Sequence, residues 1–407
     1  MTDTQILRPL AYAYAQAAQS AANDERRLLH RAVNDLKMVR PVVLIDEIPF
    51  HELDFDGSLT LRCTDPVFRG AEDFFRKKLF QWKYFPADMI LTPYYPVYKV
   101  MTSTGIGLEV EEKTLATDEN NYIVSHEYHD RLATPEDLAK IRIPEIGYDE
   151  AATRAVFDKI ANAVGDLIPV RITGHNAYSS MWDEISFYRG VTPLLIDLAE
   201  RPEFSHAIIR KFTDIELSVS EQMERLGLYE PNPIGIHCTA ALCSELPGES
   251  DGGPTRRSQV WGRGMAQIFG SVSKAMHEEF DIAYMKEVFA PFGLTYYGCC
   301  EPLDRKIDIL EQLPHLRKIG VSPWADVDVA AEAIGGKYVL ANKPNPAAVA
   351  AVLDEDALRK EISRTLAACK RNGCSCDIVL KDISSAGYKL DNLVRWEKTV
   401  MEMVRSW

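Results

Sequence analysis

The chain lacks the features that nucleic-acid and membrane proteins need. Its 407 residues include 46 Lys and Arg against 60 Asp and Glu, a formal net charge of −14. Phosphate backbones and anionic membranes are bound by clustered basic residues, and no such cluster occurs. No apolar run reaches the roughly 18 residues of a membrane-spanning helix. Because Met1–Ala22 also lacks the basic-then-apolar order of a secretion signal, we expect a cytoplasmic protein.

Several familiar motifs are absent or incomplete. No Gly-x-Gly-x-x-Gly follows the first strand-like run, which weakens a dinucleotide-binding interpretation. His277-Glu278-Glu279 lacks the second histidine of a His-Glu-x-x-His zinc helix, because Asp281 occupies that position. The eight cysteines of a large cytosolic chain are expected to be free thiols or ligands rather than disulfides. Cys374 and Cys376 have no second pair at zinc-knuckle spacing.

Short apolar runs ending in Pro, Gly, Ser or Asp dominate the rest of the chain. The eight runs are Asp88–Val97, Leu167–Gly174, Ile234–Cys238, Met265–Val272, Leu294–Cys300, Leu316–Val321, Tyr338–Ala341 and Cys376–Ile383. Helix-like segments lie between most of them. Eight strands that alternate with helices predict an α/β fold, a TIM (β/α)8 barrel over residues 86–407. A doubly wound open sheet is the second choice.

Residues 1–85 differ in character and predict an N-terminal helical extension. The stretch Gln16–Met38 and the stretch Asp65–Trp82 have helical spacing, and Pro41–Phe50 is a short apolar strand that ends in Asp46-Glu47. A long insertion, residues 102–143, follows the first predicted barrel strand. It contains two alternating, strand-like pieces, Gly107–Val110 and Asn121–His126. We expect this β-rich insertion to form an ordered flap over the barrel.

The stretch Tyr296–Pro302 carries two thiols and a carboxylate at the end of a buried strand. Loops after the carboxyl ends of barrel strands are where barrel enzymes place their chemistry. Strand alternation predicts that Tyr297, Cys299 and Glu301 share one face, with Cys300 packed outward against helices. Cys299, His237 and Glu301 are the candidate metal ligands, because zinc takes thiolate, imidazole and carboxylate. The alternative is that both thiols are small buried hydrophobes.

Other polar groups follow predicted strands at the same rim. We expect Glu301, Lys381 and Asp382 to be catalytic, as general acids, bases or charge partners. An Asp at such a position can instead cap a helix, which is the competing interpretation for Asp382 and for Asp326. The predicted substrate-binding residues supply aromatic walls and polar or cationic anchors: His175, Asn176, Tyr178, Trp182, Arg263, Trp324 and Lys343.

Residues from about 40 to the C-terminus resemble the uroporphyrinogen decarboxylase-like superfamily. The resemblance lies in Arg189–Leu195 with Arg201-Pro202-Glu203, in Tyr297–Pro302 and in Asn342–Pro346. It implies a TIM barrel. The Met-Arg-Gln-Ala-Gly-Arg phrase of true uroporphyrinogen decarboxylases is missing, which favours the branch of corrinoid-dependent methyltransferases. Their zinc-binding His-x-Cys aligns with Tyr297 and Cys299. The resemblance therefore carries over one zinc ligand, Cys299, with substitutes among Glu301, His237 and Asp382.

This resemblance implies a methyltransferase that moves a methyl group from a small substrate, such as an aromatic methyl ether, to a corrinoid protein. The corrinoid protein would dock near the flap, and zinc is the expected cofactor. The alternative is a metal-independent decarboxylase or lyase that holds a small carboxylated substrate with Arg263, Lys343 and Lys381. A non-catalytic binding or assembly barrel is a third interpretation. Enzymes of this size are often homodimers, so a homodimer is a possible assembly, although the sequence does not determine the oligomeric state.

Overall fold

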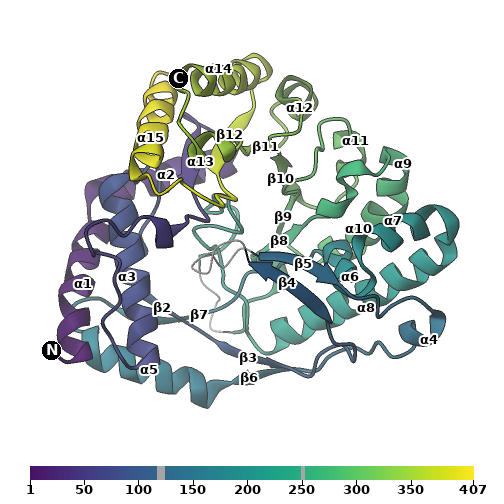
Figure 1. The fold of residues 1–407 in the computed structure, drawn as a ribbon, viewed down its shortest axis with the longest axis horizontal. Helices are drawn as coiled ribbons and strands as arrows, with labels where there is room; N and C mark the ends of the chain where they lie inside the picture. The colour runs from purple at the N-terminus through teal and green to yellow at the C-terminus, as the bar shows by residue number, and fades with distance from the viewer. Residues whose placement is uncertain (117–123, 249–252) are drawn as a thin grey trace.

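A six-stranded parallel sheet forms the centre of the molecule (Figure 1). The computed structural model describes residues 1–116, 124–248 and 253–407. In spatial order the strands are β1 (Val42–Ile45), β12 (Ser375–Leu380), β11 (Val339–Asn342), β10 (Leu316–Val321), β9 (Leu294–Tyr297) and β8 (Trp261–Gly264). Strands β8, β9, β11 and β12 are buried along their whole length. Such burial is typical of parallel sheets, because helices cover them.

The described residues do not form a closed eight-stranded barrel. Strands β2 (Tyr95–Tyr98) and β7 (Val170–Thr173) form a separate parallel pair. Two isolated parallel bridges, His175 to Tyr229 and Ser179 to Gly264, lead from the end of β7 towards β8. The prediction of an α/β fold with a parallel sheet is thus confirmed, whereas the closed barrel is not observed.

Two of the predicted barrel strands are wrong. Ile234–Cys238 is a tight turn, held by an antiparallel bridge between Gly235 and Ala240. Met265–Val272 is mostly the 3-10 helix η3 (Gln267–Ser271), and the strand lies just before it, as β8. Both segments are apolar because they pack in the core, so their composition mimicked a strand. Leu316–Val321, in contrast, is β10 from end to end.

Helices surround the sheet, and side-chain caps set the ends of several of them. Asp65 accepts the N–H groups of Val67 and Phe68 and so caps α3, with Pro66 at its first position. Asp326 caps α12, which is the capping role weighed for it above. The α-helices of the described residues are α1 (Asp3–Ala18), α2 (Ala21–Asn34), α3 (Pro66–Tyr84), α4 (Pro135–Leu138), α5 (Glu150–Val164), α6 (Met181–Arg189), α7 (Val191–Glu200), α8 (Pro202–Arg225), α9 (Lys274–His277), α10 (Ala283–Phe289), α11 (Ile307–Leu310), α12 (Val327–Ile334), α13 (Ala347–Ala350), α14 (Glu355–Asn372) and α15 (Leu390–Arg405).

The first 85 residues contribute a strand to the sheet as well as three α-helices. Strand β1 pairs in parallel with β12, Val42 opposite Asp377 and Ile45 opposite Leu380. The predicted single helix Gln16–Met38 is two helices, because Ser20 ends one turn and caps α2. None of the helices in the described ranges combines the length and apolar character needed to cross a bilayer. The division into an extension and a catalytic domain stays a prediction.

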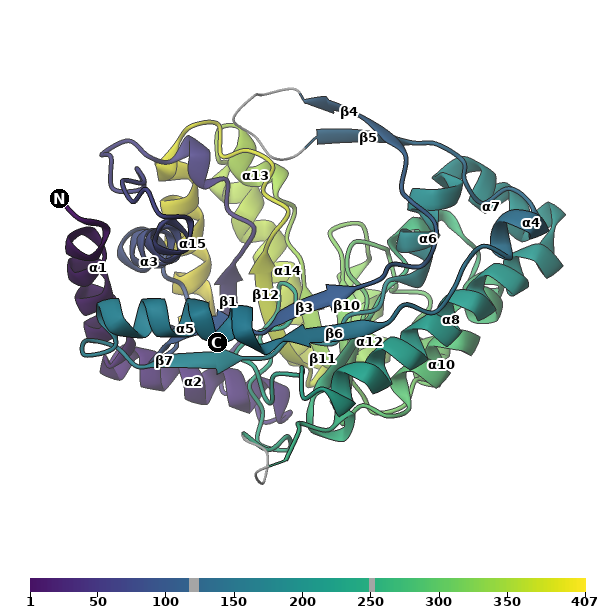
Figure 2. The ribbon, with the colours of Figure 1, turned by 90° about the horizontal axis from the view of Figure 1, so that it is seen from below.

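The insertion contributes short antiparallel strands on one side of the molecule. Strand β3 (Val100–Ser103) pairs with β6 (Ile146–Asp149), and β4 (Glu112–Ala116) pairs with β5 (Val124–Tyr128). Figure 2 shows β4 and β5 lifted away from the six-stranded sheet. Gly107–Val110 is not a strand, and of Asn121–His126 the residues 121–123 lie outside the described residues.

A fully buried ion pair ties two strands of the sheet to a neighbouring loop. Lys318 Nζ of β10 lies 2.8 Å from Asp377 Oδ2 of β12, and both side chains are 0% exposed. The ammonium also donates to the carbonyl of Ala240 and to Thr239 Oγ1, and this hydroxyl donates to Asp377. Although burial alone would raise the pKa of Asp377, Lys318 and Lys343 hold this pKa below its usual value. The pair therefore fixes the loop that follows Cys238.

We expect removal of one partner of this pair to unfold the protein easily. Asp377→Ala leaves the Lys318 ammonium buried without its carboxylate, which costs about 3–5 kcal/mol in the free energy of unfolding. Urea denaturation measures this loss. The double variant Lys318→Met, Asp377→Leu should recover most of it, and Lys274→Ala, which breaks an exposed pair with Asp308, should cost less than about 1 kcal/mol. Equal losses in the first and last variants would contradict this assignment.

Candidate functional site

The loop after β9 brings both of its thiols to one place. Strand β9 ends at Tyr297, and Gly298 has a φ of 103°, a conformation that favours glycine. Strand alternation therefore stops there. Tyr297 points into the helix layer, where its hydroxyl bonds Asp281, while Cys299 points to the sheet interior. The predicted shared face of Tyr297 and Cys299 is wrong, and so is the outward packing of Cys300.

Cys299 is surrounded by donors and cations. Its Sγ lies 3.2 Å from Lys381 Nζ, 3.6 Å from Cys300 Sγ and 3.8 Å from His237 Nε2. The hydrogen bond with Cys300 contributes most to lowering the pKa of the Cys299 thiol, followed by His237 and Lys381, and these contributions outweigh the opposing effect of burial. The pKa of Cys300 is raised in turn by its hydrogen bond to Cys299. The surroundings of Cys299 therefore favour its thiolate form.

Lys381 and Asp382 extend this cluster from the end of β12. Lys381 Nζ lies 2.6 Å from Asp382 Oδ2, and Cys300 Sγ donates to the same oxygen at 3.2 Å. The two thiols, Lys381 and Asp382 line a cavity of about 420 Å3. Lys343 and Trp324 line it too. Predicted catalytic, metal-binding and substrate-binding residues thus meet at one cavity. Asp382 caps no helix within the described residues and is 48% exposed.

A second group of ligand-type side chains lies beside Cys299. One ligand atom each from Glu47, His237 and Cys238 falls within 4.8 Å of the others, a spacing that could hold a metal ion. Two of these residues, Glu47 and Cys238, were missed as metal ligands from the sequence. Asp46-Glu47 ends the strand-like part of Pro41–Phe50. Polar residues at the ends of other predicted strands were chosen as site candidates, and the same criterion would have selected Glu47. Its proximity to His237 depends on the pairing of β1 with β12.

Non-glycine residues with positive φ hold the loops of this site. Glu47 has a φ of 50°, Cys238 of 56° and Asp382 of 55°. Each such conformation costs on the order of 1–3 kcal/mol, and it persists only where the surroundings impose it. The backbone N–H of Asp382 donates to Glu47 Oε2 at 2.8 Å, and Lys343 Nζ donates to the carbonyl of Cys238 at 2.5 Å. These contacts hold the three strained loops in place.

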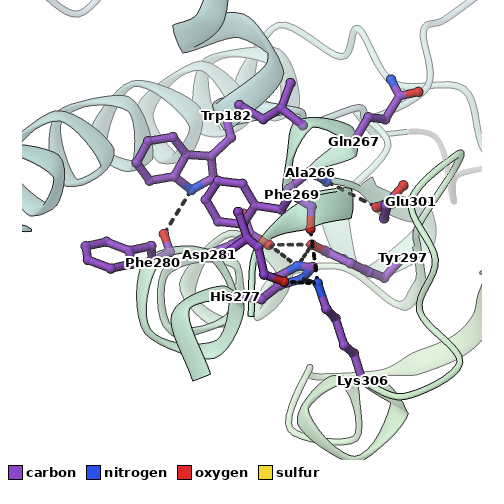
Figure 3. Close-up of polar contacts among 12 residues, drawn as sticks. Trp182, Ala266, Gln267, Phe269, His277, Phe280, Asp281, Tyr297, Glu301 and Lys306 are labelled. Carbon is purple, nitrogen blue, oxygen red and sulfur yellow. Dashed lines mark hydrogen bonds and ion pairs between the residues drawn. The ribbon is translucent and has the colours of Figure 1, made fainter. Parts of the chain in front are cut away.

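Glu301 lies behind Cys299 rather than in the cavity. Its two carboxylate oxygens accept the backbone N–H groups of Cys299, at 2.9 Å, and of Ala266, at 3.3 Å (Figure 3). The side chain is 1% exposed, and burial raises the pKa of Glu301 to about 7. These contacts give Glu301 a role in positioning the Cys299 backbone. The structure does not bring it into the group formed by Glu47, His237 and Cys238.

A buried polar network supports this part of the chain. His277 Nε2 lies 2.7 Å from the Tyr297 hydroxyl, which donates to Asp281, and Lys306 Nζ lies 3.2 Å from His277 Nδ1 (Figure 3). Lys306 also donates to the carbonyls of Phe269 and Val272. Every member is inside the helix layer. The network therefore fixes the end of β9 from the side opposite to the thiols.

The remaining predicted substrate-binding residues separate into two groups. Tyr178 and Arg263 lie near the thiols, because the Tyr178 ring is 5.4 Å from the His237 ring and 4.6 Å from the Arg263 guanidinium. His175 bonds the Lys99 carbonyl at 2.7 Å, and Asn176 donates to the Gly235 carbonyl. Trp182 is 1% exposed and donates to the Phe280 carbonyl, deep in the helix layer (Figure 3). The structure therefore does not bring Trp182 to the cavity.

Comparisons with known proteins do not assign this chain to a family. No family model matches the sequence, and no curated protein matches it. Among solved structures 21 chains match, and one of them is a methyltransferase from Methanosarcina mazei. It is 14% identical, with a TM-score of 0.49, and the alignment covers 93% of this chain and 98% of that chain. The superfamily resemblance stays a prediction.

We expect the stability of the protein to depend on the ionisation of Glu301. A carboxyl whose folded pKa is raised keeps its contribution to stability at low pH and loses it as the pH rises through the folded pKa, here about 7. Relative to Glu301→Gln, the wild type should therefore lose about 2.5 kcal/mol of unfolding free energy between pH 5 and pH 8. Urea denaturation at both pH values tests this. A difference that is constant with pH would contradict the raised pKa.

We also expect Cys299 to react as a thiolate. Iodoacetamide should alkylate it at a nearly constant rate from pH 6 to pH 8, measured by peptide mass spectrometry after treatment with EDTA. Lys381→Met removes the ammonium 3.2 Å from the sulfur and should slow the reaction at pH 6 by about tenfold or more. Lys337→Met is the control, because Lys337 is 62% exposed and pairs with Glu311. An unchanged rate in Lys381→Met would show that Lys381 does not stabilise the thiolate form of Cys299.

Proposed function

We propose that the chain is a methyltransferase that takes a methyl group from a small methylated substrate and passes it to a corrinoid carried by another protein. One observation carries the proposal, namely the convergence of Glu47, His237 and Cys238 beside the Cys299 thiolate. Methyl groups on oxygen, nitrogen or sulfur move slowly because the atom left behind must accept the bonding electrons. A site for methyl transfer therefore needs groups that stabilise negative charge.

The residues present fit zinc. Carboxylate oxygen, imidazole nitrogen and thiolate sulfur are its usual ligands, and catalytic zinc sites have three protein ligands and one open position. Glu47, His237 and Cys238 would hold the ion. Burial raises the pKa of the Cys238 thiol, and a coordinating metal removes the proton of such a thiol. When bound, zinc would act as a Lewis acid on the atom that loses the methyl group.

Lys381 supplies the second source of positive charge. Its ammonium is 3% exposed and lines the 420 Å3 cavity. Burial opposes its charge, but Cys299, Cys300 and Asp382 raise the pKa of Lys381, so the group stays protonated. It can donate a hydrogen bond to a leaving group in the cavity. Glu301 holds the backbone of Cys299, and the substrate contacts fall to Lys343 and Trp324. The methyl acceptor, a reduced corrinoid, would approach from the open side of this cavity.

A decarboxylase or lyase without metal is the second candidate. The observation that favours it is the set of buried cations around the site, because Arg263, Lys343 and Lys381 are each at most 3% exposed. Buried cations hold carboxylates well. In that reaction Lys343, whose pKa is lowered by burial, would bind a carboxylate of the substrate, and the carboxylate that is lost would depart as carbon dioxide with its bonding electrons left on the substrate carbon. The two candidates differ in their need for Glu47, His237 and Cys238.

The proposal predicts about one zinc ion per chain, measured by mass spectrometry of the purified protein. His237→Ala and Cys238→Ser should lose the metal, whereas Cys243→Ser should retain it, because the buried Cys243 lies near Asn232 and outside the group. Cys299→Ser should keep the metal. Full activity of a metal-free wild-type protein would show that the reaction does not need zinc.

Methyl transfer is tested with reduced cobalamin as the acceptor. Methoxylated aromatics, methylamines and methyl thioethers are supplied as donors, and the absorbance change on methylation of the cobalt is followed. We expect one donor class to react with the wild type and Cys243→Ser, with a loss of about 100-fold or more in Cys238→Ser and Lys381→Met. Carbon dioxide release from a carboxylated substrate, without any methyl transfer, would favour the second candidate.

A further inference from the structure

A cavity of about 580 Å3 lies next to the space that the candidate metal ligands face. Glu47, His237 and Cys238 line a neighbouring cavity of about 510 Å3. Lys78 and Tyr98 line both cavities, so the two spaces meet at these side chains. Together they are large enough for a small organic molecule. The larger of the two has no role in the methyl transfer proposed above.

Cations outnumber carboxylates in the lining of the 580 Å3 cavity. Its cationic side chains are those of Arg27, Arg31, Lys78 and Arg171. Glu230 is the one carboxylate among the described residues of this lining, and it is already paired, because Arg171 Nη2 lies 3.2 Å from its Oε1. Four cations against one carboxylate leave three positive charges without a carboxylate in the lining.

Two of these cations, Arg27 and Arg31, are neighbours on one face of α2. They are four residues apart, a spacing at which like charges destabilise a helix. Burial lowers the pKa of Arg27, and the charge of Arg31 lowers it further. The Arg31 guanidinium forms no hydrogen bond or ion pair with the described residues, and Arg27 Nη2 donates over a long 3.5 Å to the Leu91 carbonyl. An anion bound between the two guanidiniums would relieve their repulsion.

Lys78 brings a further cation from α3. Gln81, one turn later on the same helix, donates to the Ile45 carbonyl at 2.8 Å, so this side of α3 approaches the edge strand β1. The Lys78 ammonium has no hydrogen-bond or ion-pair partner in the described ranges. The residue is exposed, in contrast to the buried Lys318 and Lys343. Lys78 therefore places accessible charge where the two cavities meet.

Arg171 of β7 and Arg27 of α2 converge on the ring of Tyr94, which also lines the 580 Å3 cavity. The Arg171 Cζ lies 5.1 Å from the ring centre, a cation–π contact. Burial raises the pKa of Tyr94, and the charges of Arg171 and Arg27 oppose this effect. The Arg171 side chain is 36% exposed, so its pairing with Glu230 does not close it off. Cations from two elements that are far apart in the sequence therefore meet at one place in this cavity.

The surplus of positive charge selects a phosphate over a carboxylate. A phosphate monoester carries about −1.5 to −2 charges at pH 7 and offers three acceptor oxygens. Guanidinium groups bind phosphate with two parallel hydrogen bonds, and here several of them line one space. Ile90 and Tyr98 add apolar surface where the two cavities meet. The lining thus suits a ligand with a phosphate at one end and an organic body at the other.

We propose that this cavity binds a phosphorylated small organic molecule. Arg27, Arg31 and Arg171 hold the phosphate, and the organic body lies along Tyr98 towards the candidate metal ligands. Lys78 donates a further hydrogen bond to the ligand at the junction of the cavities. The inference goes beyond the proposed function and does not rest on it, since phosphate binding needs neither a metal nor a corrinoid.

Calorimetric titration of the purified full chain tests the site. After treatment with EDTA, and in a phosphate-free buffer, phenyl phosphate is the probe, with phenol, benzoate and inorganic phosphate for comparison. Phenyl phosphate should bind at least tenfold more tightly than each of the other three, because it alone combines the phosphate charge with an aromatic ring. Equal affinity for phenol or benzoate would overturn the choice of phosphate, and equal affinity for inorganic phosphate would overturn the organic body.

Variants test the two parts of the cavity separately. The double variant Arg27→Gln, Arg31→Gln should weaken phenyl phosphate binding by about 100-fold, because two charge-assisted contacts are lost. Tyr98→Ala should weaken phenyl phosphate binding by about tenfold and leave inorganic phosphate binding unchanged. Arg305→Gln is the control, because the Arg305 side chain is 87% exposed and lines neither cavity.

Stability separates a ligand site from a structural role of the two arginines. Removal of like charges from α2 should leave the melting temperature of the ligand-free double variant at or above that of the wild type. Phenyl phosphate should raise the melting temperature of the wild type and not that of the double variant. If the double variant does not fold, Lys78→Met replaces it, and a loss of about tenfold in phenyl phosphate affinity is expected. Phenyl phosphate binding that survives these substitutions would overturn the proposal.

Discussion

The buried pair of Lys318 and Asp377 is the interaction on which the geometry of the site depends. It joins β10 and β12 across the interior, and through Thr239 and Ala240 it holds the turn that presents His237 and Cys238. Asp377 of β12 precedes Lys381, the first residue after this strand, by four positions, so a shift of β12 would move Lys381 away from Cys299. A buried ion pair adds little net stability, but a rearrangement that separates its partners leaves a buried charge without compensation.

Strain and burial are concentrated around the same loops. Glu47, Cys238 and Asp382 adopt left-handed conformations, and hydrogen bonds from the Asp382 N–H and from Lys343 connect them. Residues of these types have no intrinsic preference for such a conformation strong enough to impose it. Holding a carboxylate and two thiols close together therefore costs conformational free energy in the folded state. Strained residues are often found in active sites, and here they surround the thiols and the other side chains that could bind a metal.

The sequence predicts those elements whose local pattern agrees with their tertiary environment. Leu316–Val321 is a continuous apolar run and is β10 in full. Strand β8 is not predicted from the sequence, because its two glycines are typical of a loop. A Cβ at Gly262 would lie 2.7 Å from Phe292, and one at Gly264 would lie 2.8 Å from Met285, so close helix packing requires glycine there. Similarly, the closeness of Glu47 to His237 depends on a strand pairing between residues more than 300 positions apart, which no local pattern contains.

Cations gather in the interior around the thiols of this acidic chain. Arg263, Lys318, Lys343 and Lys381 are all at most 3% exposed, and Asp377 is the carboxylate bonded to Lys318 among the described residues. Glu301 offers little compensation, because burial raises its pKa to about 7. The Cys299 thiolate supplies a second negative charge, next to Lys381. The balance that remains favours an anionic ligand. The net charge of −14 belongs to the chain as a whole, whereas the choice of ligand depends on the cations around the thiols.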